Sequence, residues 1–135
     1  MAYIKFYSKE REEFKTATNT HIFEPDISMI FRKLCRHFKI TNVKLEIGKM
    51  RDGCGRATYS GYGISVIKVS KKTDFLILCH EISHIYNRQK LHCWGHNKRL
   101  WKTLKRIIKY CEKKNYWGMV SQTSTSPTEG QSYPD

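Results

Sequence analysis

The feature that most constrains this chain is a pair of histidines four residues apart inside its most apolar stretch. Residues 75–86 are rich in Phe, Leu and Ile, and within them the motif HExxH runs from His80 to His84. Residues four apart on a helix differ by about 40° in direction and about 6 Å in height. Both imidazoles can therefore point to one ion from a single buried helix, and the sequence predicts such a helix here.

The residue between the two histidines indicates what such an ion could do. Two imidazoles can bind Zn²⁺ at about 2.0–2.1 Å, and Glu81 projects beside them, where its carboxylate reaches a water on the metal without binding the metal itself. Zinc lowers the pKa of that water towards about 7, and the carboxylate accepts its proton. The motif therefore predicts a zinc site with Glu81 as general base.

A catalytic zinc needs a third protein ligand and one open position. The candidates are His92, Cys93, His96 and Glu112. We favour His96, because eleven residues separate it from His84, enough for the helix to end and the chain to turn back. Glu112 lies some four helical turns further on, so it cannot easily serve together with His96. His92 and Cys93 remain as alternatives within the connection.

The other elements follow from hydrophobic periodicity and turn residues. Thr73 as N-cap and Asp74 in the first turn predict that the HExxH helix begins there, and it extends to about Gln89. The remaining predicted elements are, in order, a helix over roughly 25–38, strands over 43–47, 56–60 and 64–69, and a last helix over 97–114. No element is predicted for residues 1–23.

These elements predict an α+β fold with an N-terminal helix, a small three-stranded sheet, the HExxH helix and a basic C-terminal helix. A chain of 135 residues has room for one domain, which we expect over 1–118. Residues 119–135 are dominated by Ser, Thr, Gln, Gly and Pro, and we expect a disordered tail there.

The charge of the chain points to a polyanionic partner. Lys and Arg number 25 against 12 Asp and Glu, a net charge of +13. Nucleic acid bound through its phosphates, without reading of bases, is the predicted partner, although solubility alone would also explain such a charge. The predicted contacts on the last helix are Lys98, Arg99, Lys102, Lys105, Arg106 and Lys109.

Several classes of protein are disfavoured. The five cysteines are odd in number and form no CxxC pair, which argues against a disulfide framework and a zinc ribbon. No stretch reaches the roughly 18 apolar residues of a membrane span, and the first residues lack the apolar run of a signal peptide. We therefore expect a reducing cytoplasmic or nuclear location, no membrane contact and, by default, a monomer.

The arrangement of motifs resembles the SprT-like zinc metallopeptidases, which include Spartan-type members. The resemblance rests on HExxH, on Gly95-His96 followed by a helix that contains Trp101, and on the segments 55–59 and 64–70, which are similar to paired strands before the active-site helix. Tyr86 also falls on an aromatic position of Spartan-type members. The match covers about residues 25–114.

This resemblance implies a minimal zincin core, hydrolysis of peptide bonds, and DNA-bound or crosslinked proteins as substrates. It implies that His80, His84 and His96 are the zinc ligands and that Glu81 is the general base. Tyr86 becomes a candidate to stabilise the oxyanion or line the site, with core packing as its alternative role.

The sequence hypothesis is thus a zinc metallopeptidase that acts on proteins on or near nucleic acid. An edge strand, expected at 64–70, would align an extended substrate by β-augmentation. The alternative is a basic nucleic-acid-binding protein with a structural or non-proteolytic zinc site, in which aromatic residues stack on single strands. Glu81 favours the peptidase, since a structural site needs no carboxylate between its ligands. A peptidase for one specific partner, with the charge irrelevant, is a third possibility.

Overall fold

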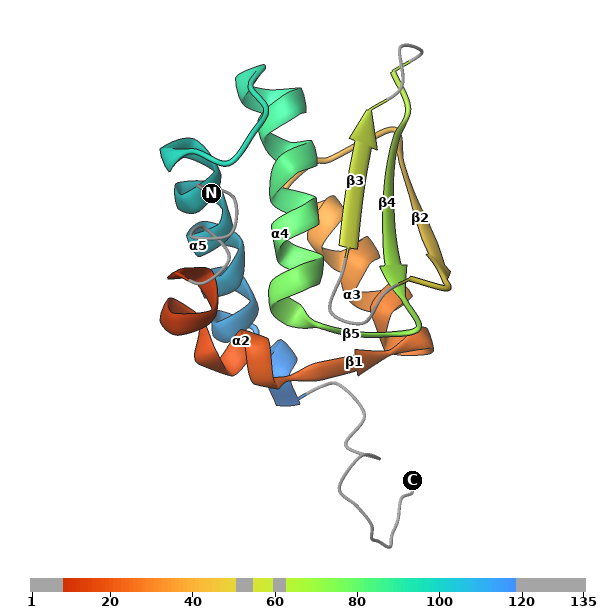
Figure 1. The fold of residues 1–135 in the computed structure, drawn as a ribbon, viewed down its shortest axis with the longest axis vertical. Coiled ribbons are helices and arrows are strands. Elements are labelled where there is room, and N and C mark those ends of the chain that lie inside the picture. The colour runs from red at the N-terminus through yellow and green to blue at the C-terminus, as the bar shows by residue number, and fades with distance from the viewer. Residues whose placement is uncertain (1–8, 51–54, 60–62, 119–135) are drawn as a thin grey trace, which may run out of the picture.

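The computed structural model describes residues 9–50, 55–59 and 63–118, and it has an α+β fold. Helix α4 (Phe75–Tyr86) runs between a three-stranded sheet on one side and helix α5 (Lys98–Lys113) on the other (Figure 1). The predicted tail over 119–135 lies outside the described residues. The α+β class and the helix that carries the HExxH motif are as the sequence predicts.

The larger sheet contains β2 (Val43–Gly48), β3 (Gly55–Tyr59) and β4 (Ser65–Ser70) in the order β2-β4-β3. β2 pairs with β4 in parallel, and β3 pairs with β4 antiparallel. The sequence prediction that 64–70 is an edge strand is therefore wrong, because β4 has a neighbour on each side. The edges of this sheet are β2 and β3.

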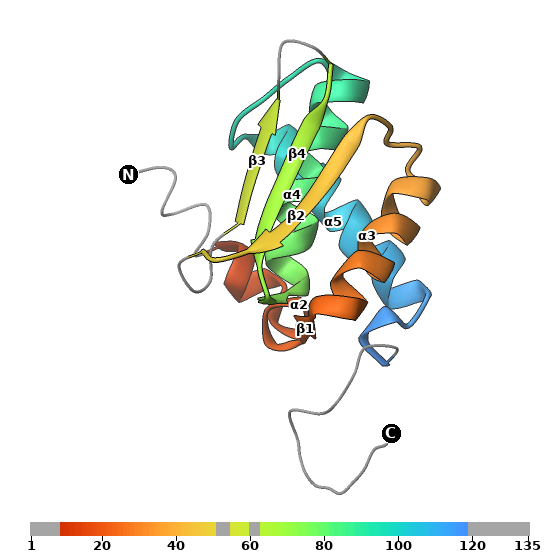
Figure 2. The same ribbon diagram turned by 90° about the vertical axis from the view of Figure 1, so that its right-hand side faces the viewer.

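The helices gather on one face of this sheet. α4 lies against β3 and β4, while α3 (Glu24–His37) lies against β2 on the same side (Figure 1). In the view onto the other face, no described element covers the strands (Figure 2). The burial follows this arrangement: Ile67 and Val69 of β4 are fully buried, whereas Lys44 and Glu46 of β2 are exposed. The sheet thus presents a single core face to the helices.

The N-terminal region adds structure that the sequence analysis did not predict. Residues 9–13 are helical, and α2 (Lys15–Asn19) follows. β1 (His21–Phe23) then pairs antiparallel with β5 (Lys72–Asp74) in a second, two-stranded sheet at the start of α4. These segments bring the N-terminal region against α4, so α4 is enclosed on this side as well.

The start and end of the HExxH helix differ from the sequence prediction. Thr73 belongs to β5, and the N-cap is Asp74, whose carboxylate accepts a hydrogen bond of 2.8 Å from the Ile77 N–H. α4 ends at Tyr86, and the π-helical segment η1 (Asn87–Leu91) continues it. A left-handed residue, His92 (φ 55°), then ends the segment. The α-helix therefore ends before Gln89, and Gln89 itself lies in the wider π-helical turn that follows.

Two side chains of η1 tie this turn to neighbouring elements. Asn87 is buried, and its Oδ1 accepts a hydrogen bond of 2.5 Å from Thr103 Oγ1 on α5. Gln89 pairs with both backbone groups of Thr41, donating to its carbonyl at 2.5 Å and accepting from its N–H at 3.2 Å. These contacts hold the chain where it leaves α4, just before the connection that carries His96.

The core lies where the helices meet the sheet. Every residue of α4 from Phe75 to Ile85 is buried, whereas α5 buries one face. Cys35, Cys79 and Cys111 are buried and free, and Cys93 is free and half-buried. The short helix η2 (Tyr116–Gly118) ends the described part. No helix within the described residues is both long and apolar enough to cross a membrane.

Candidate metal centre

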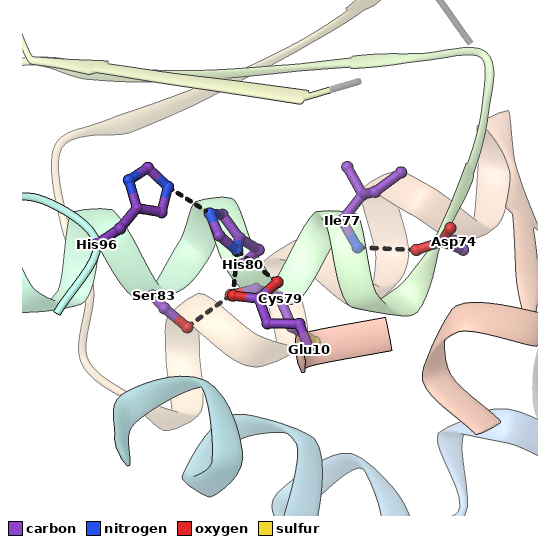
Figure 3. Close-up of polar contacts among 7 residues, drawn as sticks. All are labelled: Glu10, Asp74, Ile77, Cys79, His80, Ser83 and His96. Carbon is purple, nitrogen blue, oxygen red and sulfur yellow. Dashed lines mark hydrogen bonds and ion pairs between the residues drawn. The ribbon is translucent and has the colours of Figure 1, made fainter. Parts of the chain in front are cut away.

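The structure brings His80, His84 and His96 together. The two histidines of α4 stand one turn apart. His96 reaches His80 from the connection before α5 (Figure 3). One ligand nitrogen from each residue lies within 4.8 Å of the others, and His80 Nε2 is 3.2 Å from His96 Nε2. His80 and His84 are buried and His96 is half-buried. A metal ion here would be held inside the protein yet remain reachable from the His96 side.

The spacing of these nitrogens fits a metal ion. Two ligands at about 2.0–2.1 Å in a tetrahedral site are about 3.3 Å apart, close to the observed distance between His80 Nε2 and His96 Nε2. The Nδ1 of His84 is buried and has no hydrogen-bond partner among the described residues. Three imidazoles are a donor set that zinc accepts readily. Together they form a site that could hold a metal ion.

Local structure on both sides of His96 fixes its position. Gly95 has a φ of 111°, a conformation that favours glycine, and it turns the chain immediately before the histidine. Asn97 follows as the N-cap of α5, with its Oδ1 accepting a hydrogen bond of 3.1 Å from the Leu100 N–H. The exposed ring of Trp94 lies over His84, with 5.2 Å between ring centroids. His96 is thus held between a glycine turn and a capped helix.

Burial keeps the histidines neutral. It lowers the pKa of His80 to about 4, and burial together with His80 and His96 lowers the pKa of His84 to about 3. The pKa of His96 is also lowered, first by burial and then by His80. Neutral imidazoles have a lone pair to give to a cation, so no proton needs to leave at neutral pH before a metal binds.

Glu81 of α4 lies against the edge strand β3. It is 4% exposed, and a Cβ placed on Gly55 of β3 would be 3.1 Å from Glu81 Cγ and 3.3 Å from Glu81 Oε2. Burial, and then the nearby Glu10 carboxyl, raise the pKa of Glu81 to about 8. The metal-free protein therefore keeps this carboxyl mostly protonated at neutral pH, and a cation bound by the three histidines would lower its pKa and free it to accept a proton.

Sequence reasoning missed one residue of this site, Glu10. Its two carboxylate oxygens lie 2.7 and 2.8 Å from His80 Nδ1, although 70 residues separate the two in sequence (Figure 3). Glu10 is fully buried, and burial raises its pKa to about 8, partly opposed by Arg11. One signal was present: Glu10, Phe14 and Ala17 follow a helical i, i+4, i+7 spacing, so an acid occupies an otherwise apolar face.

The structure keeps the other candidate ligands apart from the three histidines. Among the described residues, His92, Cys93 and Glu112 do not join the group whose ligand atoms converge. His92 and Glu112 are exposed, and Glu112 lies near the end of α5. His96 is therefore the one of the four candidates that shares a site with His80 and His84.

Tyr86 lies on another side of α4 from the histidines. Its hydroxyl accepts a hydrogen bond of 2.9 Å from Arg106 on α5, and its ring meets Phe38 edge-on at 6.1 Å. Residue 86 is about 200° around the helix axis from His84, which explains this placement. These contacts place Tyr86 in the packing between α4 and α5, and the oxyanion role implied by the resemblance stays a prediction.

The six predicted nucleic-acid contacts all lie exposed on α5: Lys98, Arg99, Lys102, Lys105, Arg106 and Lys109. Arg106 differs from the others, because its guanidinium lies over the rings of Phe38 and Tyr86 at 5.5 and 5.3 Å. The remaining five make no contact of this kind that involves α3 or α4.

Comparisons of the chain with protein-family models, with curated proteins and with solved structures gave no match. What the geometry itself provides is a three-histidine site on α4 and its following connection that could hold a metal ion.

Proposed function

We propose that this protein is a zinc metallopeptidase of the SprT-like type, which hydrolyses peptide bonds of proteins. The observation that carries the proposal is the combination of three convergent histidines with Glu81, a buried carboxyl on the same helix that lies against an edge strand. A purely structural zinc site would use the histidines and leave no role for Glu81.

The chemistry of the proposal divides between the metal and the chain. A bound zinc ion supplies a Lewis acid for the scissile carbonyl and lowers the pKa of a coordinated water. Glu81 accepts the proton of the attacking water and returns it to the leaving amine. Burial of Glu81 strengthens this role, because a desolvated carboxylate binds a proton more tightly than an exposed one.

The edge strand β3 is the proposed docking strand for the substrate. Its partner on one side is β4, and its other edge is not paired within the described sheet. An extended peptide added there would run beside Glu81, because Gly55 of β3 is in close contact with that side chain. This proposal replaces the strand 64–70 of the sequence hypothesis with residues 55–59.

Nucleic acid is the proposed partner that brings substrates to the site. The exposed basic residues of α5 and the net charge of +13 support this part of the proposal. Proteins bound or crosslinked to DNA would then be the substrates, as the SprT-like resemblance implies. The competing proposal is a nucleic-acid-binding protein whose metal site is not used for hydrolysis.

The variant Glu81→Gln tests the catalytic proposal. It keeps the shape of the side chain and removes the base, so we expect about one zinc per chain in both proteins and a loss of peptidase activity of at least about 100-fold. Cleavage of casein and self-cleavage, each with and without DNA, provide the assay, and metal analysis provides the zinc content. Glu46→Gln, an exposed position on β2, is the matched control and should remain active.

Three outcomes would count against this proposal. Equal activity in the wild type and in Glu81→Gln would contradict the mechanism. Zinc binding in a wild type that cleaves nothing under any of these conditions would favour the competing proposal. Zinc that remains at full affinity in His96→Ala would contradict the ligand set itself.

A further inference from the structure

We propose that Glu10 is a positioning residue of the metal centre, which holds the His80 imidazole through Nδ1 so that Nε2 faces the metal. This inference rests on the proposed function, because it assigns a role towards the same metal. It extends the site beyond the HExxH motif to the N-terminal region, where the sequence offered no prediction.

The contact geometry carries the inference. Both carboxylate oxygens of Glu10 lie within 2.8 Å of His80 Nδ1, while His80 Nε2 lies 3.2 Å from His96 Nε2 (Figure 3). A metal bound at Nε2 requires the ring proton to stay on Nδ1, which then donates to Glu10. Carboxylate partners of this kind fix the tautomer and orientation of a metal-binding histidine and make it a stronger donor to the metal.

The N-terminal region is built to hold Glu10 in this place. The Phe14 N–H donates a hydrogen bond of 2.8 Å to the Glu10 carbonyl, and the Phe14 ring lies 5.5 Å from the ring of Trp101 on α5. Ala17 of α2 is buried further along. These contacts hold the segment around Phe14 and Ala17 against α4 and α5, so the position of Glu10 does not depend on its contact with His80 alone.

Variants of Glu10 in the full chain test the inference. Glu10→Leu removes the acceptor, and Glu10→Gln keeps an acceptor without the charge. We expect zinc affinity, measured by competition with a chromophoric chelator, to fall about 10- to 100-fold in Glu10→Leu and by less in Glu10→Gln. Glu12→Gln and Glu13→Gln are matched controls on the same segment, because both side chains are exposed, and their affinity should stay within about twofold of the wild type.

Two spectroscopic readouts separate positioning from mere packing. The zinc-loaded wild type should show a downfield, slowly exchanging imidazole N–H proton from His80 Nδ1, which Glu10→Leu should lose. The visible bands of the cobalt-loaded protein should shift in Glu10→Leu and Glu10→Gln and stay unchanged in both controls. If Glu10→Leu does not fold, judged by thermal unfolding of the metal-free protein, Glu10→Gln decides by itself.

The two proposals fail in different ways. A wild type that binds no zinc would overturn the proposed function and this inference together. A wild type that binds zinc, with Glu10→Gln and Glu10→Leu at the same affinity and with the same spectra as the controls, would overturn the role of Glu10 alone.

Discussion

The two helices next to the candidate site, α4 and α5, differ in how much of their surface is buried. α4 is buried over its whole length from Phe75 to Ile85, so even its polar residues lie inside the protein. α5 buries one face and exposes a continuous set of basic side chains on the other. Because burying a polar group is costly, the polar residues of α4 need partners, whereas the exposed lysines of α5 need only water.

This difference explains where chemistry and where binding are expected. On α4, His80 contacts Glu10 and His96, and the Ser83 hydroxyl donates to the Cys79 carbonyl at 2.7 Å. On α5, the exposed lysines can be exchanged without loss of core packing. We therefore expect substitutions around α4 to change stability and metal binding, and substitutions on the outer face of α5 to change association with a polyanion.

The sharpest test of the enclosed environment of α4 is Gly55→Ala. A Cβ at Gly55 would lie 2.7 Å from Ile77 Cγ2 and 3.1 Å from Glu81 Cγ, closer than atoms can approach without movement. We expect a loss of about 1–3 kcal/mol in the free energy of unfolding, because over-packing forces neighbours from their positions. Urea titration measures it, and the peptidase rate should fall with the displacement of Glu81.

Gly48→Ala is the matched control for this substitution. Gly48 ends β2 with no atom within 4 Å of its added Cβ, and it has no positive φ. An alanine there should change stability by no more than about 0.5–1 kcal/mol, in the stabilising direction. Similar losses at both positions would show that α4 is not tightly enclosed by β3.

The N-caps of the two helices provide a second, smaller test. Asp74 of α4 is buried and accepts from Ile77 N–H, whereas Asn97 of α5 is exposed and accepts from Leu100 N–H. Asp74→Ala leaves a buried donor without its acceptor, and we expect a loss of about 1–2 kcal/mol. Asn97→Ala lets water replace the cap, and we expect about 0.5–1 kcal/mol. Equal losses in chemical denaturation would contradict the contrast in burial.

The pH dependence of stability sharpens the comparison of the caps. Burial raises the pKa of Asp74 above its usual value of 3.8, opposed in part by the Ile77 N–H. The folded state then binds the proton more tightly than the unfolded state, so this residue's contribution to stability is greatest below pH 3.8 and declines as the pH rises through the folded pKa. Asp74→Asn keeps an acceptor and should remove that decline. A stability–pH profile unchanged by Asp74→Asn would contradict it.

Much of this fold could be predicted from periodicity. The apolar spacing from Ile27 to Cys35 predicted α3 within one residue at each end, and alternation predicted the strand at Val43–Ile47. Local sequence could not show which strand lies in the centre of the sheet, because pairing is a contact between distant segments. β4 was therefore expected at an edge, and the pairing of β1 with β5 went unpredicted.

The residues of the candidate site also differ in whether local sequence could predict them. The spacing of His80 and His84 is a local property of one helix, and His96 follows from the length of the connection and the helix after it. Glu10 was missed because its role depends on a contact across 70 residues. The packing of Tyr86 was not visible locally either, because Arg106 on α5 donates to its hydroxyl, and the position of Tyr86 two residues after His84 gives no sign of that contact.

The smallest effect on stability, and the largest on association, is expected on the outer face of α5. Lys98, Lys102, Lys105 and Lys109 follow an i, i+4, i+7, i+11 spacing and form one exposed stripe, and Arg106 is left in place because it contacts Tyr86. Changing all four lysines to Gln should leave unfolding and zinc content unchanged. If the stripe contacts phosphates, the slope of log affinity for DNA against log salt should fall by up to about 0.9 per lost contact. A control variant makes the same change of charge at four lysines that are exposed on other parts of the chain, and it should retain most of that slope. These are Lys33, Lys44, Lys49 and Lys71, each changed to Gln. Equal losses in the two variants would mean that net charge alone attracts nucleic acid, and no binding by the wild type at low salt would leave a metallopeptidase without this partner.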